Sequence, residues 1–425
     1  MKWRMYPLER IAEVAGGSTP KRSRSEYWDG NIPWVTPTDL PMPGSGIAEV
    51  YDTVNHITER GLRSCAAKLL PVGTVLYSSR ATIGKIGIAR VPLATNQGFA
   101  NFTPKPGIES KYLAYALLYF TPEIASLAGS TTFKEVRRGA LKKYKLPLPP
   151  LSEQRRIVEI LDQADALRKK RAEADAKAAR ILPALFYKMF GDPATNPKGW
   201  PIQPLGYVSG QNGLITDGDW ILSQNMDANG SIRLIQLADI GIGTFLDRSR
   251  KYITEEKFLE LKCTEVREGD LLVSRMADPI GRACIVPNLQ QRAITAVDVT
   301  IVRPDRKVAL PEYLSALCNT EYFLNKAASA ATGTTRRRIT RRNLEKIEIP
   351  IPPITEQMKF AALFKGLAGN IDKQQQSSEM LEVLYRTLLH RAFTGDLTAQ
   401  WREAHMKELL EEMEQQAKAL ENRMP

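Results

Sequence analysis

Apolar residues recur at helical spacing in two long stretches of this chain. In the first stretch they alternate by three and four residues from Ile157 to Leu185, with a polar break at Arg171. The second stretch runs from Phe360 to Leu388 with the same spacing. Its polar middle consists of Asn370, Gln374 and Ser377. This spacing is typical of the core positions of a coiled coil. It predicts two long helices, neither of which can bury its apolar stripe alone.

Prolines, hydroxyl residues and glycines predict where these helices begin and end. Paired prolines disfavour helix before Leu151 and before Ile354. Pro183 predicts a kink late in the first helix, because a proline inside a helix removes one backbone hydrogen bond. The predicted capping residues are Ser152 and Thr355 at the starts and Gly191 and Gly395 at the ends.

The helices belong to an internal repeat. Residues 146–154 read LPLPPLSEQ, and residues 349–357 read IPIPPITEQ, at an offset of 203. The same offset carries Phe190 onto Phe393 without a gap. A weaker, ordered similarity continues upstream, where residues 73–78 match residues 269–274. The chain is therefore predicted to hold two copies of one unit, each a variable globular part followed by a helix.

The variable parts mix short strand-like runs with helical segments. Strands are predicted at Val72–Tyr77, Gly87–Ala89, Asp270–Ser274 and Val297–Val302, and helices at Tyr112–Phe120 and Pro311–Lys326. The predicted fold class is α+β, with two mixed α/β domains and two long helices that pair as an antiparallel coiled coil around a pseudo-twofold repeat. In the alternative arrangement, each helix packs on its own domain. The expected segments are domain one at 1–150, helix one at 151–195, domain two at 196–353, helix two at 354–397 and a helical tail at 398–425.

The charge is unevenly distributed along the chain. Lys and Arg number 59 against 47 Asp and Glu, a formal charge of +12. Residues 1–146 carry 20 basic and 11 acidic residues, and residues 196–349 carry 21 and 18. The positive excess therefore belongs mainly to the globular parts, and such a charge suits a nucleic-acid partner.

Several classes of site and location are disfavoured by the sequence. The four cysteines form no C-x-x-C pair, and no two of the three histidines have ligand spacing, so neither a disulfide framework nor a metal site is indicated. Gly84-Lys85 lacks the remainder of a phosphate-binding loop. The longest apolar run, Tyr112–Phe120, is far shorter than the ~20 residues of a membrane span. The N-terminus lacks the apolar core of a secretory signal, so a cytoplasmic protein is expected.

Basic residues gather at a few places in the globular parts. Five arginines lie within residues 336–342, next to two threonines, and a smaller cluster occupies the matching place in the first copy. Such clusters favour contacts with phosphate groups. In the alternative interpretation they form an ordinary solvated surface. The candidate residues in these clusters are Lys21, Arg22, Arg24, Lys134, Arg137, Arg138, Arg336, Arg337, Arg338, Arg341 and Arg342.

A second group of candidates follows predicted strands. Arg80 and Arg275 each come after serines that end an apolar run, which predicts an arginine fork at a loop tip where it can pair with guanine. Asn96 and Gln97 lie in another loop, and an amide can read adenine. Local turn chemistry by serine and asparagine is the alternative. Arg282, in the repeated Ile-Gly-basic turn, completes the set of candidate DNA contacts.

The sequence resembles the specificity subunit of Type I restriction-modification systems. The resemblance rests on two diverged globular units, each followed by a P-x-P-P-x-[ST]-E-Q helix that ends in F-G-D or F-x-G-D. The segments that carry it are LPLPPLSEQRRIVEILDQAD, IPIPPITEQ and HRAFTGDLTAQWRE. It covers essentially the full chain, and the second copy departs from the family pattern after Gln357.

The resemblance implies a non-catalytic DNA-recognition subunit. Each globular unit would be a target-recognition domain that reads half of a bipartite double-stranded DNA site, with the helices as spacer. The subunit would hold no cofactor and would recruit two adenine methyltransferase subunits, which use S-adenosylmethionine. It would also recruit two restriction subunits, which use ATP and Mg. Two alternatives are a self-contained methyltransferase or nuclease, and a scaffold that binds only proteins.

Overall fold

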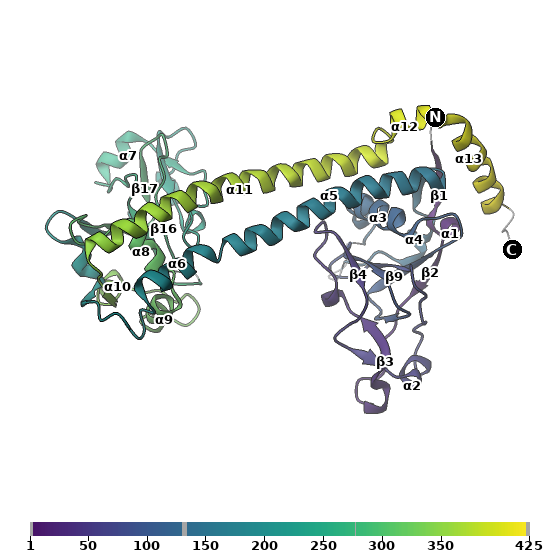
Figure 1. The fold of residues 1–425 in the computed structure, drawn as a ribbon, viewed down its shortest axis with the longest axis horizontal. Helices are drawn as coiled ribbons and strands as arrows, with labels where there is room; N and C mark the ends of the chain where they lie inside the picture. Colours follow the sequence, from purple (N-terminus) through teal and green to yellow (C-terminus); the bar gives the residue numbers. More distant parts are fainter. Residues whose placement is uncertain (1–2, 130–133, 277, 422–425) are drawn as a thin grey trace. The chain divides into compact units, whose positions relative to one another are not determined.

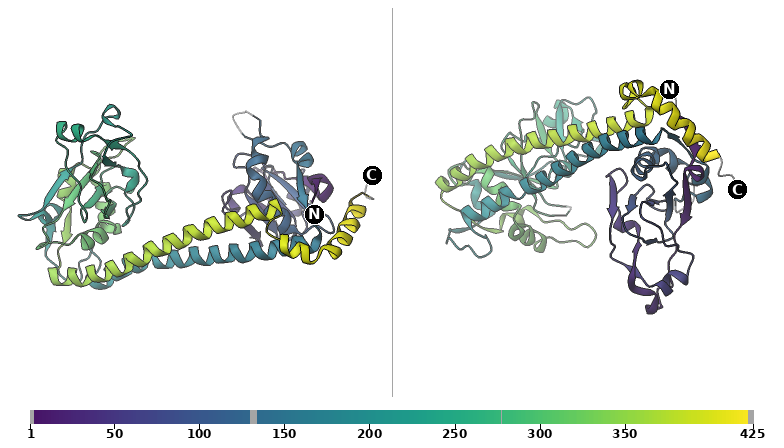
Figure 2. Two further views of the ribbon diagram at one scale, coloured as in Figure 1. Left: turned by 90° about the horizontal axis from the view of Figure 1, so that it is seen from above. Right: turned by 45° about the vertical axis from the view of Figure 1, so that its right-hand side comes forward.

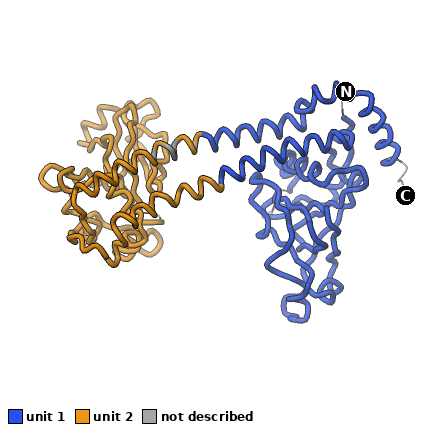
Figure 3. The backbone as a smooth tube through the Cα atoms, in the orientation of Figure 1, with its two compact units in different colours: residues 1–172, 377–425 blue, residues 173–376 orange. Residues whose placement is uncertain are grey.

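The computed structural model describes residues 3–129, 134–276 and 278–421 of the chain (Figure 1). The chain divides into two compact units (Figure 3). Unit 1 comprises residues 1–172 and 377–425, and unit 2 comprises residues 173–376. Each long helix passes from one unit into the other, so each unit contains one end of both helices.

Unit 1 is built around a five-stranded sheet whose one face is covered by α3 (Ser110–Ser126). The strand order is β2 (Ala12–Gly16), β9 (Phe99–Pro104), β6 (Val75–Ser78), β7 (Ile86–Ala89) and β4 (Ile47–Val50). A three-stranded sheet follows the order β5 (His56–Ile57), β3 (Trp28–Val35) and β8 (Ala94–Thr95), and β1 (Arg4–Pro7) pairs with β10 (Lys145–Leu148). The short helices are α1 (Leu8–Ile11), η1 (Ser25–Tyr27), η2 (Pro37–Asp39), α2 (Glu59–Arg63) and α4 (Arg138–Lys143).

Unit 2 repeats this plan. Its four-stranded sheet has the order β12 (Leu214–Asp217), β18 (Val299–Arg303), β15 (Leu271–Ser274) and β16 (Ala283–Ile285). Its three-stranded sheet has the order β14 (Tyr252–Ile253), β13 (Ile232–Ile235) and β17 (Ala293–Thr295), and β11 (Ile202–Pro204) pairs with β19 (Glu348–Pro350). The helices are η3 (Leu205–Ser209), η4 (Ser223–Asn225), η5 (Leu237–Asp239), α7 (Glu255–Glu260), α8 (Pro311–Cys318), α9 (Glu321–Ser329) and α10 (Arg341–Glu345).

The predicted duplication is confirmed at the level of topology. The order β2-β9-β6-β7 of unit 1 corresponds to β12-β18-β15-β16 of unit 2. In both three-stranded sheets the central strand pairs antiparallel with one neighbour and parallel with the other. Unit 1 adds β4, which lies parallel to β7. The observed strands β6, β7, β15 and β18 are almost entirely buried, because their side chains belong to the core clusters on the two faces of each sheet. The predicted strand at Val72–Tyr77 begins later, at Val75, and Val72 is exposed.

The long helices are present, with two differences from the prediction. They are α5 (Leu151–Ala178), α6 (Ile181–Phe190) and α11 (Ile354–Thr394). The first helix is interrupted just before Pro183, which then lies in the first turn of α6, where a missing N–H costs nothing. Ser152 and Thr355 lie inside the first turns, not at the predicted caps. The helix ends at Gly191 and Gly395 are as predicted, with φ of +82° and +88°.

Within unit 1, α5 packs both on the domain and on α11. Ile157 and Leu161 share one hydrophobic cluster with residues of α3 and with Tyr385 and Leu389 of α11. Arg168 pairs with Glu382 at 3.3 Å. The start of α5 meets the segment after α11, so the two helices run antiparallel in this unit.

In unit 2, Phe186 of α6 and Phe360 of α11 contact each other edge to face. The side chain of Asn370 lies outside the described residues.

Two other helical predictions changed in detail. The segment predicted at Pro311–Lys326 divides into α8 and α9 because Thr320 accepts a hydrogen bond from the amide of Phe323 and so caps a new helix. The C-terminal tail forms α12 (Ala399–Ala404) and α13 (Met406–Glu421), which lie beside the start of α5 in unit 1 (Figure 2). Residues 422–425 of the tail lie outside the described residues.

Candidate nucleic-acid interface

The repeated P-P-x-[ST]-E-Q motif joins each long helix to its globular domain in the same way. The Gln154 carboxamide donates to the carbonyl of Pro149 at 2.9 Å and accepts from the amide of Glu109 at 2.9 Å. Gln357 donates to the carbonyl of Pro352 at 2.8 Å and accepts from the amide of Leu310 at 2.9 Å. A carboxamide is needed here because it can donate and accept at once. The motif therefore fixes the helix start against the domain in both copies.

A basic side chain performs the same structural task in both domains. The Lys85 ammonium donates to the carbonyls of Pro37 at 2.6 Å and Leu40 at 3.2 Å. In unit 2, the guanidinium of Arg282 donates to the carbonyls of Ile240 at 2.8 Å and Leu237 at 3.2 Å. Burial lowers the pKa of Arg282. Arg282 thus ties two loops of its own domain together, and its predicted DNA contact stays a prediction.

The expectation that Arg275 lies at an exposed loop tip is wrong. Its side chain is buried, with only 3% of the residue surface exposed, and its guanidinium pairs with Asp217 and donates to the carbonyl of Val297. Ser274 is buried as well. The amide of Arg275 donates to the carbonyl of Asp298 at 2.9 Å. This bond extends the strand pairing by one residue, so Arg275 is held in the sheet and not in the following loop.

Arg275 belongs to a set of paired charges that we call the arginine–aspartate network, comprising Arg275, Arg338, Arg341, Asp217 and Asp298. Nε of Arg275 lies 3.3 Å from Oδ1 of Asp217, and Nε of Arg341 lies 4.0 Å from Oδ2 of the same carboxylate. Nε of Arg338 lies 3.0 Å from Oδ1 of Asp298. Two of the five clustered arginines are therefore paired within the domain while staying partly exposed, and Arg341 also lies 3.5 Å from Glu345.

The other three arginines of the cluster face solvent. Thr332 and Arg338 exchange two backbone hydrogen bonds of 2.9 Å, which close a loop of residues 332–338, the arginine loop. Its tip, residues 333–337, is exposed and carries Arg336 and Arg337. Arg337 also donates to the carbonyl of Ala328. Arg342 is exposed on α10. These positions can reach a phosphate backbone without losing an internal ion pair.

The matching surface of unit 1 is also basic. Lys134, Arg137 and Arg138 are all exposed. Arg80 is exposed and lies 3.9 Å from Glu135, so it is on the surface as predicted. The serines before it do not share that position, because Ser78 and Ser79 are buried in the domain.

A second basic loop of unit 1 lies against the Asn96-Gln97 turn. Its residues Lys21, Arg22 and Arg24 are exposed. The Thr19 hydroxyl, at the start of this loop, donates to the side chain of Gln97. The Asn96 side chain accepts from the amide of Gly98 at 2.9 Å, which is turn chemistry. The structure thus brings together two groups of candidates that are far apart in the sequence.

The loop of unit 2 that contains Asp219 and Trp220 is equivalent to this basic loop, and the sequence alone did not mark it as a candidate. The amide of Asp219 donates to the carbonyl of Thr295 at 2.7 Å, as the amide of Ser18 does to Thr95 at 2.9 Å in unit 1. The loop carries no basic cluster, and it exposes Trp220 to 67%. Its position in the repeat could have identified it as a candidate, because this loop occupies the place of the basic loop in the other copy.

Among the described residues, no group of His, Cys, Asp and Glu side chains is arranged to hold a metal ion. The four cysteines are free, and burial raises the pKa of Cys263 to about 11 and of Cys284 to about 12. Those thiols therefore stay protonated near neutral pH.

In the part of the chain that the structure describes, no helix is long and apolar enough to cross a bilayer.

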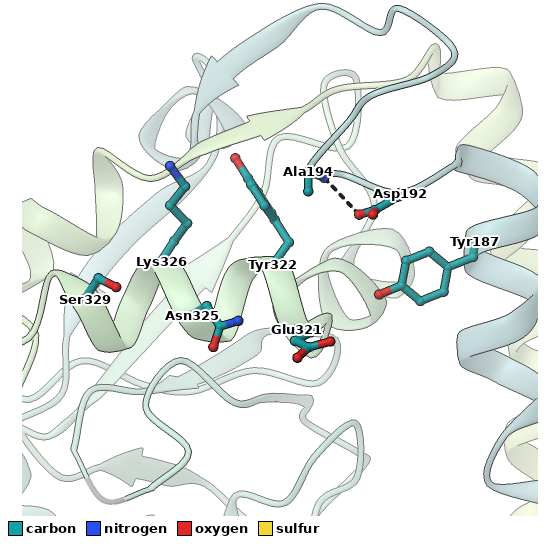
Figure 4. Close-up of a pocket in the computed structure, with 8 residues that line it drawn as sticks. All are labelled: Tyr187, Asp192, Ala194, Glu321, Tyr322, Asn325, Lys326 and Ser329. Carbon is teal, nitrogen blue, oxygen red and sulfur yellow. Dashed lines mark hydrogen bonds between the residues drawn. The ribbon is translucent and has the colours of Figure 1, made fainter.

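An open groove of about 510 Å³ in unit 2 lies between α9 and the segment after α6 (Figure 4). Its polar groups are used locally. The Asp192 carboxylate accepts from the amide of Ala194 at 2.9 Å, and the Tyr322 hydroxyl donates to the carbonyl of Glu348 at 3.0 Å. None of the candidate DNA contacts lines this groove.

Comparison with known proteins identifies the family. A family model described as the Type I restriction modification DNA specificity domain matches residues 1–175 and again residues 215–386. The chain belongs to this family. It is a DNA-recognition subunit, and not a catalytic one, with one specificity domain in each copy of its internal repeat.

Other specificity subunits resemble the whole chain. The specificity subunit of the Type I restriction enzyme MjaIX of Methanocaldococcus jannaschii is 28% identical over 418 residues, and the match covers 93% of each chain. That of EcoBI of Escherichia coli is 24% identical, covering 93% of this chain and 81% of the relative. A crystal structure of the Type I system S subunit from M. genitalium has a TM-score of 0.55 at 13% identity, covering 92% of this chain and 96% of that one. It shows the same fold.

Proposed function

We propose that this specificity subunit reads a bipartite double-stranded DNA site, one half with each domain. The observation that carries the proposal is the duplicated domain, with its matching strand order and an exposed basic surface at equivalent places. Those surfaces are residues 134–138 in unit 1 and residues 333–342 in unit 2. Two domains of different sequence on one chain suit a site with two different constant blocks.

The residues proposed to reach DNA are those that the fold leaves outward. In unit 1 they are Lys21, Arg22, Arg24, Arg80, Asn96, Gln97, Lys134, Arg137 and Arg138, and in unit 2 they are Arg336, Arg337 and Arg342. Arg275, Arg282, Arg338 and Arg341 are assigned internal roles, because each guanidinium is occupied by a carboxylate or by backbone carbonyls.

The long helices are proposed to form an antiparallel coiled coil that sets the gap between the two half-sites. Their packing in unit 1 supports this, since Arg168 of α5 pairs with Glu382 of α11 and Tyr385 joins the same apolar cluster as Leu161. An uninterrupted α11 of 41 residues is about 60 Å long at 1.5 Å per residue. That is enough to separate two domains on a duplex.

The subunit is further proposed to act in the cytoplasm within a larger complex. Two adenine methyltransferase subunits using S-adenosylmethionine and two restriction subunits using ATP and Mg would be its partners. The internal repeat supports this stoichiometry, because a pseudo-twofold chain offers two similar surfaces to two identical partners.

The experiment is to co-express the chain with its methyltransferase and to locate the modified adenines in the host genome. We expect one motif with two constant blocks around a gap of fixed length. One continuous block, or a gap of variable length, would contradict the proposal. Incubating the purified chain alone with S-adenosylmethionine and DNA should give no methyl transfer, and transfer would support the self-contained enzyme instead.

A further inference from the structure

The arginine–aspartate network lies directly at the base of the arginine loop. Arg275 is covalently next to Met276, which forms a bridge with Arg338, the last residue of the loop. The amide of Ile339 donates to the carbonyl of Arg275 at 3.0 Å. Arg275 and Arg338 also both donate to the carbonyl of Val297. Side-chain and backbone contacts therefore connect Arg275 to the closing residues of the loop.

Asp217 is the carboxylate that pairs with Arg275, the buried arginine of the network. Asp217 also lies 4.0 Å from Arg341, which has a second carboxylate, Glu345, at 3.5 Å. Burial lowers the pKa of Arg275, and the charge of Asp217 opposes that shift, while the nearby charges of Arg338 and Arg341 add to it. Removing Asp217 would leave the buried guanidinium of Arg275 without its paired carboxylate, whereas Arg341 would keep Glu345.

Among the residues of unit 1 that the structure describes, the equivalent place holds no such network. The amide of Ser79 donates to the carbonyl of Gly98 at 2.9 Å, as the amide of Arg275 does to Asp298. The amide of Val136 donates to the carbonyl of Ser79, as that of Ile339 does to Arg275. A buried serine thus occupies the position of Arg275. Within the described residues, the first domain therefore lacks the Arg275–Asp217 pair and serves as an internal comparison.

We propose that Arg275 and Asp217 are positioning residues that do not touch DNA. They hold the arginine loop in the single shape in which the second domain discriminates its half-site. This inference rests on the proposed function, in which the exposed tip of the loop contacts DNA. Because the network acts through the loop, disturbing one buried residue displaces Arg336 and Arg337 together.

The test uses the complete chain in complex with its methyltransferase, and it measures DNA affinity across a salt series. Arg275→Met should reduce the slope of log affinity against log salt by more than the ~0.9 expected for one phosphate contact, because both tip arginines are displaced. The matched control is Arg306→Met, an exposed arginine of unit 2 outside the network, which removes the same charge.

The second variant separates positioning from charge. Asp217→Asn removes a negative charge, and charge alone would tighten binding to every DNA. We expect instead that discrimination against base changes in the second half-site falls roughly tenfold or more, while the first half-site is read as before. Glu268→Gln makes the same charge change on the exposed surface of unit 2 and should leave discrimination intact.

The outcomes distinguish this inference from the function on which it rests. If the wild-type complex shows no two-part recognition, the proposed function fails and the inference fails with it. If the wild type reads its site and Asp217→Asn behaves like Glu268→Gln, only the inference is overturned. It is also overturned if Arg275→Met relaxes one base pair and changes the salt slope by one contact, since that is the signature of direct readout.

Discussion

At the scale of single residues, the second domain separates arginines that touch solvent from arginines that hold the fold. Arg336, Arg337 and Arg342 face outward, whereas Arg338 and Arg341 are paired with carboxylates. These residues have identical chemistry and lie within seven positions of one another. Their surroundings alone decide which of them is available to a phosphate.

Arg337→Ala should weaken binding to all DNA sequences alike. The side chain is exposed, and its loss removes about one phosphate contact, so the salt slope should fall by ~0.9 while the methylated motif stays unchanged. A binding series from low to moderate salt measures this. Arg306→Ala is the control for loss of charge alone, and a change of motif in the Arg337 variant would refute a purely phosphate role.

The sequence found this cluster but could not sort its members. A run of arginines is visible without a structure, and so is its place at the position that matches the basic cluster of the first copy. The partners that pair with Arg338 and Arg341 are Asp298, in the turn before β18, and Asp217, at the end of β12. Both are distant in the sequence, which does not give the register of the strands next to them. For the same reason Arg275 was expected at a loop tip, because a strand of only four residues leaves the direction of the next side chain open.

At the scale of elements, the start of each long helix is fixed to its domain by one glutamine. Gln357 is fully buried and bonds the carbonyls of Pro352 and Val308 and the amide of Leu310. Gln154 makes the corresponding bonds in unit 1. The repeated motif predicted where the helices begin, but it could not predict the bonds to Gly107, Glu109, Val308 and Leu310, because those partners lie in the variable part.

Gln357→Ala should lower the free energy of unfolding by about 1–3 kcal/mol, because a buried amide and two carbonyls lose their partner. Denaturant unfolding monitored by circular dichroism measures the loss. Gln400→Ala, at an exposed position of α12, is the matched control. Equal stability of the two variants would contradict the role given to the motif.

The tail is joined to unit 1 by a buried ion pair. Glu153 accepts hydrogen bonds from Arg402 at 2.8 Å, from Thr398 at 2.6 Å and from the indole of Trp3 at 2.9 Å. Arg402 also lies over the Trp3 ring, 4.9 Å from its centroid. The prediction from sequence left the role of the tail open, because its Glu- and Lys-rich pattern indicates only an amphipathic helix.

Arg402→Met should cost about 3–5 kcal/mol, since it leaves the Glu153 carboxylate buried without a counter-charge. The double variant Glu153→Gln/Arg402→Met removes that uncompensated charge and should recover most of the loss. Thermal and denaturant unfolding of both proteins test this. If the double variant is no more stable than Arg402→Met alone, the ion pair is not the cause.

At the scale of the whole molecule, helix length is proposed to set the distance between half-sites. Deleting one heptad from each long helix shortens both by about 10 Å. The unread gap of the methylated motif should then shrink by roughly three base pairs, since the rise of a DNA duplex is about 3.4 Å per base pair. Sequencing the modified adenines gives the gap directly, and replacing the same heptads with others of equal length should leave it unchanged. An unaltered gap after the deletion would refute the spacer role.

The repeat explains why the architecture could be predicted at this scale when single contacts could not. Two copies of one pattern, 203 residues apart, show the two domains and both helices without any structure. The residues that differ between the two copies can be paired only once the structure aligns the two domains. Trp220 in place of a basic loop and Arg275 in place of Ser79 are the clearest cases.

The joining of Trp3, Glu153 and Arg402 also bears on the order in which the protein is made. Unit 2 consists of one continuous segment, 173–376, so it can fold as soon as the ribosome has released that segment. Unit 1 needs residues from both ends of the chain, because Glu153 at the start of α5 is bonded both by Trp3 and by Arg402 of the tail. A prematurely terminated chain would therefore contain a finished second domain and an unfinished first one, and quality-control proteases could remove it before it occupied a partner.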